Sequence, residues 1–185
     1  MRERIIKAFI EEIHDKGMKF TMDDLANRIG VNKRYLYQHF SSKTEILELI
    51  IDQTLSEVNE KTEQIMEDTS LSLIEKIRGV CTAMPSHFEF YDFKVLEQMK
   101  RYYPEQWTKV NAALNEWEAL RLLIEEGIQQ GELNEINTAL AIKLIIDATN
   151  SIFDQRFYME NNITLPEALS SIVDVLLFGL VKNKS

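Results

Sequence analysis

Cysteine is almost absent from this sequence, because Cys81 is the only one among 185 residues. A single cysteine cannot form an internal disulfide, and Met1-Arg2-Glu3-Arg4 lacks the apolar run of a secretory signal, so we expect a reducing, cytoplasmic location. The longest apolar stretches, 139–146 and 172–180, are far shorter than the roughly 20 residues that span a bilayer. No membrane segment is therefore predicted.

Residue patterns that hold a metal or carry catalysis are also missing. His14, His39 and His87 share no ligand spacing with one another or with Cys81, so neither a metal site nor a cofactor is predicted. The sequence contains no glycine-rich phosphate loop, no Gly-x-Ser-x-Gly elbow and no His-Glu-x-x-His. An enzyme is not expected.

Proline and glycine are scarce, with three and six residues, and no segment alternates apolar and polar residues as a half-buried strand would. These absences favour an all-α fold of nine or so helices. We expect a small helical module at 1–46 and a larger helical body at 47–185.

Positive charge is rare overall, with a net charge of -9, but it is unevenly distributed. Residues 1–48 hold nine Lys/Arg against eight Asp/Glu, and the remainder holds twelve against twenty-two. Within 25–44 there are four cations and no acid. A short basic run is usually a solvated face, so the patch indicates a nucleic-acid partner only together with a suitable local fold.

The N-terminal segment provides that fold as a series of short capped helices. Apolar residues at helical spacing predict a first helix that stops at Lys16-Gly17. A capping box, Thr21 with Asp24, opens a second helix of about eight residues that ends at Gly30. Asn32 is a suitable N-cap for a third helix, with Leu36 and Phe40 buried.

Two short helices joined by the turn Gly30-Val31-Asn32 have the form of a helix-turn-helix. If Leu36 and Phe40 point inward, Arg34 and Gln38 lie on the opposite side of the third helix, flanked by Tyr35 and Tyr37. We expect this face to enter the major groove of DNA. Lys33, the Tyr37 hydroxyl and Lys43 are predicted to contact phosphates.

The residues 21–26 (Thr-Met-Asp-Asp-Leu-Ala), then Gly30-Val31, the run 36–40 (Leu-Tyr-Gln-His-Phe) and Ser42-Lys43 resemble the N-terminal signature of TetR-family repressors. The resemblance covers about 45 residues. It implies a helical homodimer, paired through its last two long helices, that binds a palindromic operator and releases it when a small molecule enters the body. The DNA-contacting residues that it implies, together with those above, are Thr21, Lys33, Arg34, Tyr35, Tyr37, Gln38, His39 and Lys43.

Two features depart from the family pattern. A small pair commonly follows the lysine, where this chain has Arg34-Tyr35, so we expect bulkier operator contacts. The family often carries a basic N-terminal arm, whereas only Arg2 and Arg4 precede the first helix here, and we expect little contribution from an arm.

The last helix, predicted over 165–181, has an apolar stripe broader than one neighbour requires, which indicates a second copy of the chain. Predicted interface residues are Ile145, Ile152, Leu169, Ile172, Val173 and Leu176. An earlier stripe, from Trp107 to Ile128, is expected to continue until Gly131, and the segment that Asn137 caps to run on to Phe157.

Aromatic residues are absent from 41–87 and dense just after it, which suits an apolar ligand cavity, although such a stripe is more often plain core. Predicted ligand-binding residues are Met84, Phe88, Tyr91, Met99, Tyr103, Trp107, Trp117, Asn150, Phe153, Asp154 and Phe157. Together these features predict a repressor that a small, largely apolar ligand releases from its operator. The alternative is a regulator that binds DNA constitutively and responds to a protein partner through its acidic body.

Overall fold

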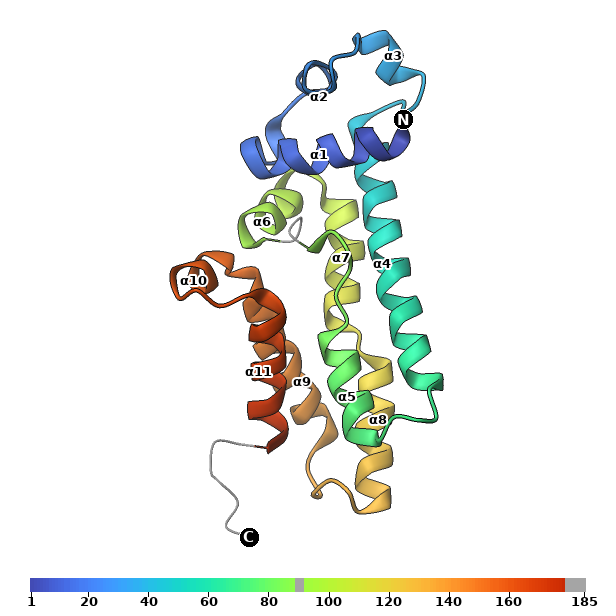
Figure 1. Cartoon of the computed structure of the whole chain (residues 1–185), viewed down its shortest axis with the longest axis vertical. Helices are drawn as coiled ribbons and strands as arrows, with labels where there is room; N and C mark the ends of the chain where they lie inside the picture. Colours follow the sequence, from blue (N-terminus) through green and yellow to red (C-terminus); the bar gives the residue numbers. More distant parts are fainter. Residues whose placement is uncertain (89–91, 179–185) are drawn as a thin grey trace. The chain divides into compact units, whose positions relative to one another are not determined.

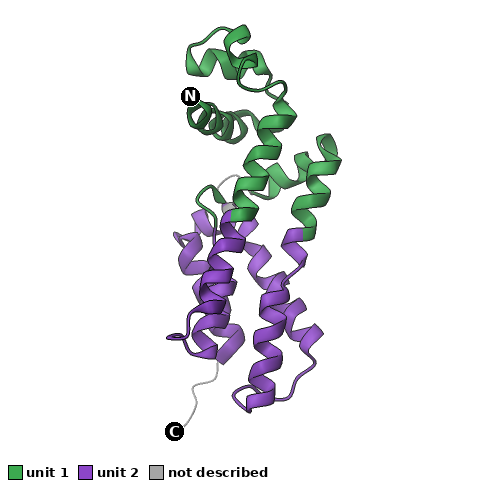
Figure 2. Cartoon of the chain, turned by 90° about the vertical axis from the view of Figure 1, so that its right-hand side faces the viewer, with its two compact units in different colours: residues 1–56, 85–112 green, residues 57–84, 113–185 purple. Residues whose placement is uncertain are grey.

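The structure, a computed structural model, describes residues 1–88 and 92–178, so the predicted ligand residue Tyr91 lies outside the described part. Every regular element in these residues is helical, as the sequence predicted. Figure 1 shows the helices in their order along the chain, which divides into two compact units (Figure 2), residues 1–56 with 85–112, and residues 57–84 with 113–185.

Unit 1 contains the N-terminal helices and a returning segment of the chain. The predicted end of the first helix at Lys16 and the eight-residue second helix are both confirmed. Its elements are α1 (Arg2–Lys16), the 3-10 turn η1 (Gly17–Lys19), α2 (Met22–Ile29), α3 (Lys33–Tyr37), the first part of α4 (Lys43–Glu67), α6 (Phe93–Tyr102) and most of α7 (Pro104–Asn115).

Unit 2 holds the remaining helices around an apolar core. Its elements are the rest of α4, α5 (Leu73–Thr82), α8 (Glu118–Gln130), α9 (Thr138–Asn150), the 3-10 turn η3 (Ser151–Phe153), α10 (Gln155–Glu160) and α11 (Leu165–Phe178). The core comprises Leu73, Ile77, Val80, Cys81, Leu120, Leu123, Ile124, Ile145 and Val173. Cys81 is thus a buried apolar side chain, and burial raises the pKa of its thiol to about 12.

The core of unit 1 is formed where α1 packs against the short helices α2 and α3 and the start of α4. Its fully buried side chains, each contributing about 1.5–3 kcal/mol by leaving water, are Ile5, Phe9, Ile13, Leu25, Leu36, Phe40, Ile46, Leu47, Ile50 and Ile51. The predicted domain boundary at residue 46 falls inside α4, and unit 1 also includes 85–112. The predicted boundary between the DNA-binding and ligand-binding regions therefore does not coincide with the boundary between the two compact units, and it remains a prediction about function.

Two helices end earlier than their apolar stripes predicted. The stripe from Trp107 to Ile128 spans two helices, because α7 ends at Asn115 and Trp117 has a non-helical backbone (φ -123°, ψ 59°). The indole Nε1 of Trp117 donates to the carbonyl oxygen of Leu114, 3.2 Å away, which occupies an acceptor that the broken helix leaves unpaired.

The segment capped by Asn137 likewise stops at Asn150 instead of continuing to Phe157. Ser151 Oγ donates to the carbonyl oxygen of Ala148 at 2.6 Å, and Asp154 accepts from the amide of Phe157 as the N-cap of α10. Ser and Asp compete with helical backbone bonding in this way, so they end one helix and begin the next.

Candidate nucleic-acid interface

The helix α2 is fixed at its start by the predicted capping box. Thr21 Oγ1 accepts from the amide of Asp24 at 3.2 Å, while Asp24 Oδ2 accepts from the Thr21 amide at 2.7 Å and from its hydroxyl at 2.6 Å. These bonds from Thr21, with another from Lys16, hold the pKa of Asp24 well below its usual range. The Thr21 hydroxyl, predicted to contact a phosphate, is therefore exposed but already engaged in the cap.

The turn between α2 and α3 has the geometry that the sequence predicted. Gly30 adopts a left-handed conformation (φ 70°, ψ 35°), and the amide of Val31 donates back to the carbonyl oxygen of Ala26 at 3.0 Å. Asn32 Oδ1 then accepts from the amide of Tyr35 at 2.8 Å, which starts α3. Because Leu36 is fully buried and α3 contacts α2, the orientation of α3 against α2 is set.

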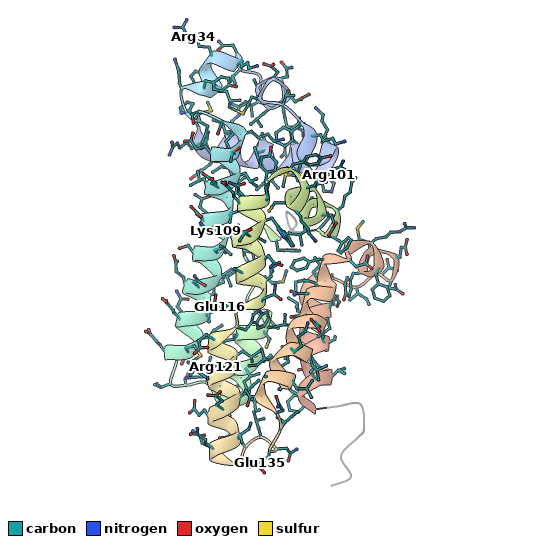
Figure 3. The ribbon with its side chains drawn as sticks, turned by 180° about the vertical axis from the view of Figure 1, so that it is seen from behind. Arg34, Arg101, Lys109, Glu116, Arg121 and Glu135 are labelled. Carbon is teal, nitrogen blue, oxygen red and sulfur yellow. The ribbon has the colours of Figure 1, made fainter. Side chains whose placement is uncertain are left out.

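The outward face of α3 presents the predicted groove-facing residues. Arg34, Tyr37 and Gln38 are exposed, and Tyr37 keeps 45% of its surface accessible. Among the described residues no hydrogen bond or ion pair engages Arg34, whose side chain extends from the tip of the module (Figure 3). This face therefore offers a free guanidinium, a phenol and an amide, which are groups that read base edges or hold phosphates.

Two residues of the same segment are less available than predicted. Tyr35 is half-buried and packs edge-to-face on His39, with ring centres 5.1 Å apart. The Nε2 atom of His39 is buried and finds no hydrogen-bond partner in the described residues. His39 therefore supports the position of Tyr35 rather than facing a groove in this structure.

Most cations of the basic patch already have partners. Lys33 Nζ lies 2.7 Å from Asp23 Oδ2. Arg28 binds Glu12 (Nε to Oε1, 2.6 Å) and Asp15 (Nη2 to Oδ2, 2.5 Å), which ties α2 to α1. The exposed Lys33–Asp23 pair is weak enough for a phosphate to displace it, whereas Arg28 serves the fold.

Lys43 differs most from its predicted role as a phosphate contact. Its Nζ donates to the carbonyl oxygens of Met18 (2.6 Å) and Phe20 (2.7 Å) and lies 3.8 Å from the centre of the Phe20 ring. Burial lowers the pKa of Lys43 to about 8, and the charges of Asp24 and Glu12 oppose that shift. In this structure Lys43 joins α4 to η1 instead of facing DNA.

The first arginines also hold the module together, a role that the sequence did not reveal. Arg4 Nη2 donates to the carbonyl oxygen of Ile29 at 2.7 Å, at the end of α2. Arg2 Nη2 donates to the carbonyl oxygen of His39 at 3.2 Å, and its guanidinium lies 4.9 Å from the ring centre of Phe40. Whether these arginines also contact DNA stays as predicted above, with little contribution from an arm.

Comparison with known proteins assigns this arrangement to a family. Residues 5–50 match the model described as "Bacterial regulatory proteins, tetR family". The whole chain is 31% identical over 185 residues to the uncharacterized HTH-type transcriptional regulator YvaF of Bacillus subtilis, covering 100% of this chain and 97% of that protein. The chain belongs to the TetR family of transcriptional regulators.

Solved TetR-family structures share the fold along the whole chain. The regulator PfmR from Thermus thermophilus superposes with a TM-score of 0.79 at 28% identity, covering 97% of this chain and 100% of that one. The regulator FadR from Bacillus subtilis, solved in complex with stearoyl-CoA, gives a TM-score of 0.68 at 19% identity, with 98% and 100% coverage. The second likeness shows the fold alone.

Membership of this family makes the chain a DNA-binding regulator, and its relatives regulate transcription rather than catalyse reactions. No helix in the described residues is long and apolar enough to cross a membrane. Those residues also contain no group of three or more His, Cys, Asp or Glu side chains placed to hold a metal ion.

The predicted ligand-binding residues are divided between the two units. Phe88, Met99, Tyr103 and Trp107 belong to unit 1, where Met99 is fully buried and so exposes no surface to a cavity. Unit 2 contains the other described members, which are Met84, Trp117, Asn150, Phe153, Asp154 and Phe157. Of these, Asp154 is exposed as the cap of α10, and Phe157 is 52% exposed.

A hollow of about 600 Å³ lies within unit 2, and Met84 is the one predicted ligand residue that lines it. Its lining comes from α4 and the segment after it, the end of α5 and the segment after it, and the start of α11, and it includes both apolar and polar side chains. The lining residues are Lys61, Gln64, Ile65, Asp68, Leu71, Gly79, Thr82, Ala83, Met84 and Pro166.

Half of the residues predicted for a dimer interface belong to the core of the chain itself. Ile145, Leu169 and Val173 are 7%, 3% and 1% exposed, so they have almost no surface left for a partner. Ile152 and Ile172 are half-buried. The apolar stripe on α11 is broad because some of its side chains are buried within unit 2, while others, such as Leu176, are exposed to solvent.

Proposed function

We propose that this TetR-family regulator binds a two-fold symmetric operator as a homodimer and represses transcription until a small, largely apolar ligand releases it. The observation that carries the proposal is the outward face of α3, with Arg34, Tyr37 and Gln38 exposed on a capped, fully packed scaffold. A rigid helix of this kind enters the major groove with its side chains already oriented.

Within that face the contacts have two kinds. Arg34 and Gln38 are the residues proposed to read base edges, because both are exposed. The guanidinium group can donate hydrogen bonds to base acceptors in the groove, and the amide group can both donate and accept them. Tyr37 and Lys33 are proposed to contact the backbone of the duplex, since a hydroxyl or ammonium group holds a phosphate without sequence preference. Thr21 is proposed to join them by exchanging its hydroxyl bond to Asp24 for one to a phosphate. Tyr35 is half-buried and is proposed to contribute by its ring edge alone.

The proposed dimer forms through the exposed apolar side chains of α9 and α11, and not through the buried residues of the same helices. Several large apolar side chains exposed on two helices that contact each other favour an interface, because monomers rarely expose large apolar patches. The side chains concerned are Leu140, Leu144, Val175, Leu176 and Phe178, each at least 38% exposed. Pairing through them is proposed to place two α3 helices about 34 Å apart, one turn of DNA.

The effector proposed for this chain has an apolar body. The aromatic residues of 88–117 suit such a ligand, and so do the apolar side chains Ile65, Leu71 and Met84 in the hollow of unit 2. FadR, which shares this fold, binds stearoyl-CoA, so long-chain acyl-CoA is the first ligand class to test. Release needs a coupling free energy of only about 1–3 kcal/mol between ligand and operator.

A second candidate is a regulator that binds DNA constitutively and is controlled by a protein partner. The observation that favours it is the acidic body, where residues 49–185 carry ten more acids than bases. A basic partner would recognise that surface by charge complementarity.

One experiment separates the two. Random duplex DNA is selected with the purified full chain, and the winning site is then titrated with acyl-CoA thioesters while the anisotropy of a labelled duplex is followed. Release by a thioester supports the ligand-controlled repressor. Failure of every thioester and free acyl chain to release a salt-sensitive, sequence-specific complex would favour control by a protein partner.

A further inference from the structure

The outer surface of α6 is unusual for this protein because its cations have no acidic partners. Elsewhere most Lys and Arg side chains bind a carboxylate or a backbone carbonyl. In the described residues, those that make neither a hydrogen bond nor an ion pair are Lys7, Lys19, Arg34, Lys94, Lys100 and Arg101. Four of these six lie on η1 and α6, which form one packed surface.

This η1–α6 surface combines positive charge with exposed aromatic rings. Within Gly17–Lys19 and Phe93–Tyr102 the single acid is Glu97, so the surface carries a net charge of +3 on an otherwise acidic chain. Phe93 and Tyr102 are 63% and 39% exposed. Both rings remain in contact with water, so their burial contributes little to the fold.

The cations are arranged around rings and not around acids. Lys19 Nζ and Arg101 Cζ lie 5.8 and 5.4 Å from the centre of the Tyr102 ring. Lys100 Nζ lies 5.9 Å from the centre of the Trp107 ring. Phosphate groups bind such cations, and a heterocyclic base stacks on such rings, so the combination suits a phosphorylated nucleotide.

The duplex that α3 binds is a poor candidate for the occupant. Within unit 1, α1 lies between the α2–α3 pair and α6, and Arg34 and Arg101 are on opposite sides of that helix (Figures 1 and 3). A straight duplex bound at α3 therefore does not reach the side of α1 on which α6 lies. The η1–α6 surface therefore requires a separate anionic ligand.

Binding at α6 would act directly on the DNA-binding module. Gln98 of α6 accepts a hydrogen bond at Oε1 from the amide of Met18, 2.6 Å away. A side chain in place of Gly17 would bring its Cβ into collision with the same Gln98 side chain, so α6 and η1 are in close contact. Because η1 links α1 to α2, a shift of α6 is transmitted to the helix-turn-helix without passing through unit 2.

We infer that the η1–α6 surface binds the phosphorylated nucleotide end of the effector, through Lys100, Arg101 and Lys19 on its phosphates and Tyr102 on its base. This deepens the proposed function and rests on it. The effector class is thereby narrowed to a coenzyme A thioester, whose 3′-phosphate, diphosphate and adenine supply both kinds of contact. A free carboxylic acid with the same chain lacks them.

The test uses the full-length dimer on its selected operator with decanoyl-CoA, decanoyl-dephospho-CoA and decanoate as probes. In wild type, decanoyl-CoA is expected to bind with at least tenfold higher affinity than either other probe. It should also release the operator at a concentration at least tenfold lower. The double variant Lys100→Gln/Arg101→Gln is expected to weaken decanoyl-CoA binding by about tenfold for each cation removed, because each loses a charge-assisted hydrogen bond. Its affinity for the operator without ligand stays unchanged.

Lys7→Gln is the matched control, since Lys7 is an exposed, unpaired cation of α1 in the same unit. It is expected to leave the binding of decanoyl-CoA as in wild type. If the double variant instead loses operator affinity without ligand, the surface contacts DNA and the inference is overturned. If decanoate and decanoyl-CoA release DNA equally well, in wild type and in the double variant, the inference fails while the proposed function stands.

A different pattern separates failure of the proposed function. If titration calorimetry shows that decanoyl-CoA binds wild type but not the double variant, and yet never releases the operator, the nucleotide surface is confirmed and ligand-controlled repression fails. Absence of any binding by decanoyl-CoA to wild type overturns the inference outright.

Discussion

The ammonium group of Lys43 lies 3.8 Å from the centre of the Phe20 ring and donates to the carbonyl oxygen of the same residue at 2.7 Å. A second bond, to the carbonyl oxygen of Met18, completes the attachment of α4 to η1. From the sequence, a cation at the start of α4 was predicted to contact a phosphate. In the structure, the ammonium group of Lys43 instead donates its hydrogen bonds to carbonyl oxygens of the protein.

Lys43→Met tests this structural role. Removing the ammonium leaves the carbonyls of Met18 and Phe20 without their donor, so the free energy of unfolding is expected to fall by about 1–3 kcal/mol in urea titrations. The salt dependence of operator binding should not change, because no phosphate contact is lost.

Lys33→Met is the comparison for that variant. Its exposed pair with Asp23 contributes less than about 1 kcal/mol to stability, while loss of a phosphate contact reduces the slope of log affinity against log salt by about one. If Lys43→Met reduced the slope of log affinity against log salt without lowering stability, Lys43 would be a phosphate contact and not a structural residue.

Arg34→Ala is expected to change which sequences the protein selects. A bidentate contact to a base discriminates by about 1–3 kcal/mol, so preference at one position in each half-site should relax by about fivefold or more. Parallel selections from random DNA with wild type and variant measure this change. An identical set of selected sites would show that Arg34 contacts only the backbone.

Tyr37→Phe addresses the other kind of contact on the same helix. Tyr37 is 45% exposed and its ring position does not depend on the hydroxyl, so only a hydrogen bond to phosphate is lost. Affinity is expected to fall by about tenfold for specific and random duplexes alike, as measured by anisotropy. A loss restricted to the selected site would instead assign Tyr37 to base recognition.

The local structure of the DNA-binding module was predictable because its signals are short-range. Thr21 and Asn32 cap the helices that their positions predicted, and Gly30 ends α2 in a left-handed conformation. Each of these features depends on residues within five positions along the chain. The exposure of Arg34 and Gln38 then follows from the burial of their helix neighbour Leu36.

Long-range partners were not predictable in the same way. The sequence shows that Lys43 is a cation, but not that it meets carbonyls 23 and 25 residues earlier. The bond from Met18 to Gln98 spans 80 residues. Apolar residues also recur at helical spacing on both sides of the break at Trp117, so the spacing alone does not reveal where α7 ends and α8 begins.

The proposed dimer, paired through the exposed faces of α9 and α11, predicts how the mass of the protein in solution responds to substitutions there. Leu144→Glu with Leu176→Glu places two charges on that surface, which would be desolvated on pairing, so the dimer is expected to dissociate at micromolar concentration. Sedimentation measures the change, and operator affinity should fall with it. Leu122→Glu is the matched control, because Leu122 is 46% exposed on α8. A dimer that survives the double change but not Leu122→Glu would move the interface to α8.

The pH dependence of stability is expected to reveal the buried acid that joins α1 to α2. Glu12 is 2% exposed and binds Arg28 at 2.6 Å and Lys16 at 3.0 Å. Burial alone would raise the pKa of Glu12, but the hydrogen bonds from Arg28 and Lys16 outweigh it and place the pKa below its ordinary value of 4.5. The folded state therefore favours the charged form.

The sign of the effect follows from that shift. A carboxyl whose pKa is lower in the folded state stabilises the protein fully above the ordinary pKa, and the contribution disappears as the pH falls through the folded value. Glu12→Gln is expected to lower the free energy of unfolding by about 1–3 kcal/mol near neutral pH, and the difference from wild type should shrink as the pH falls below 4.5. Glu11→Gln is the control, because Glu11 is exposed and lies 3.5 Å from Arg28. Urea titrations at several pH values would contradict the assignment if Glu12→Gln and wild type differed equally at all of them.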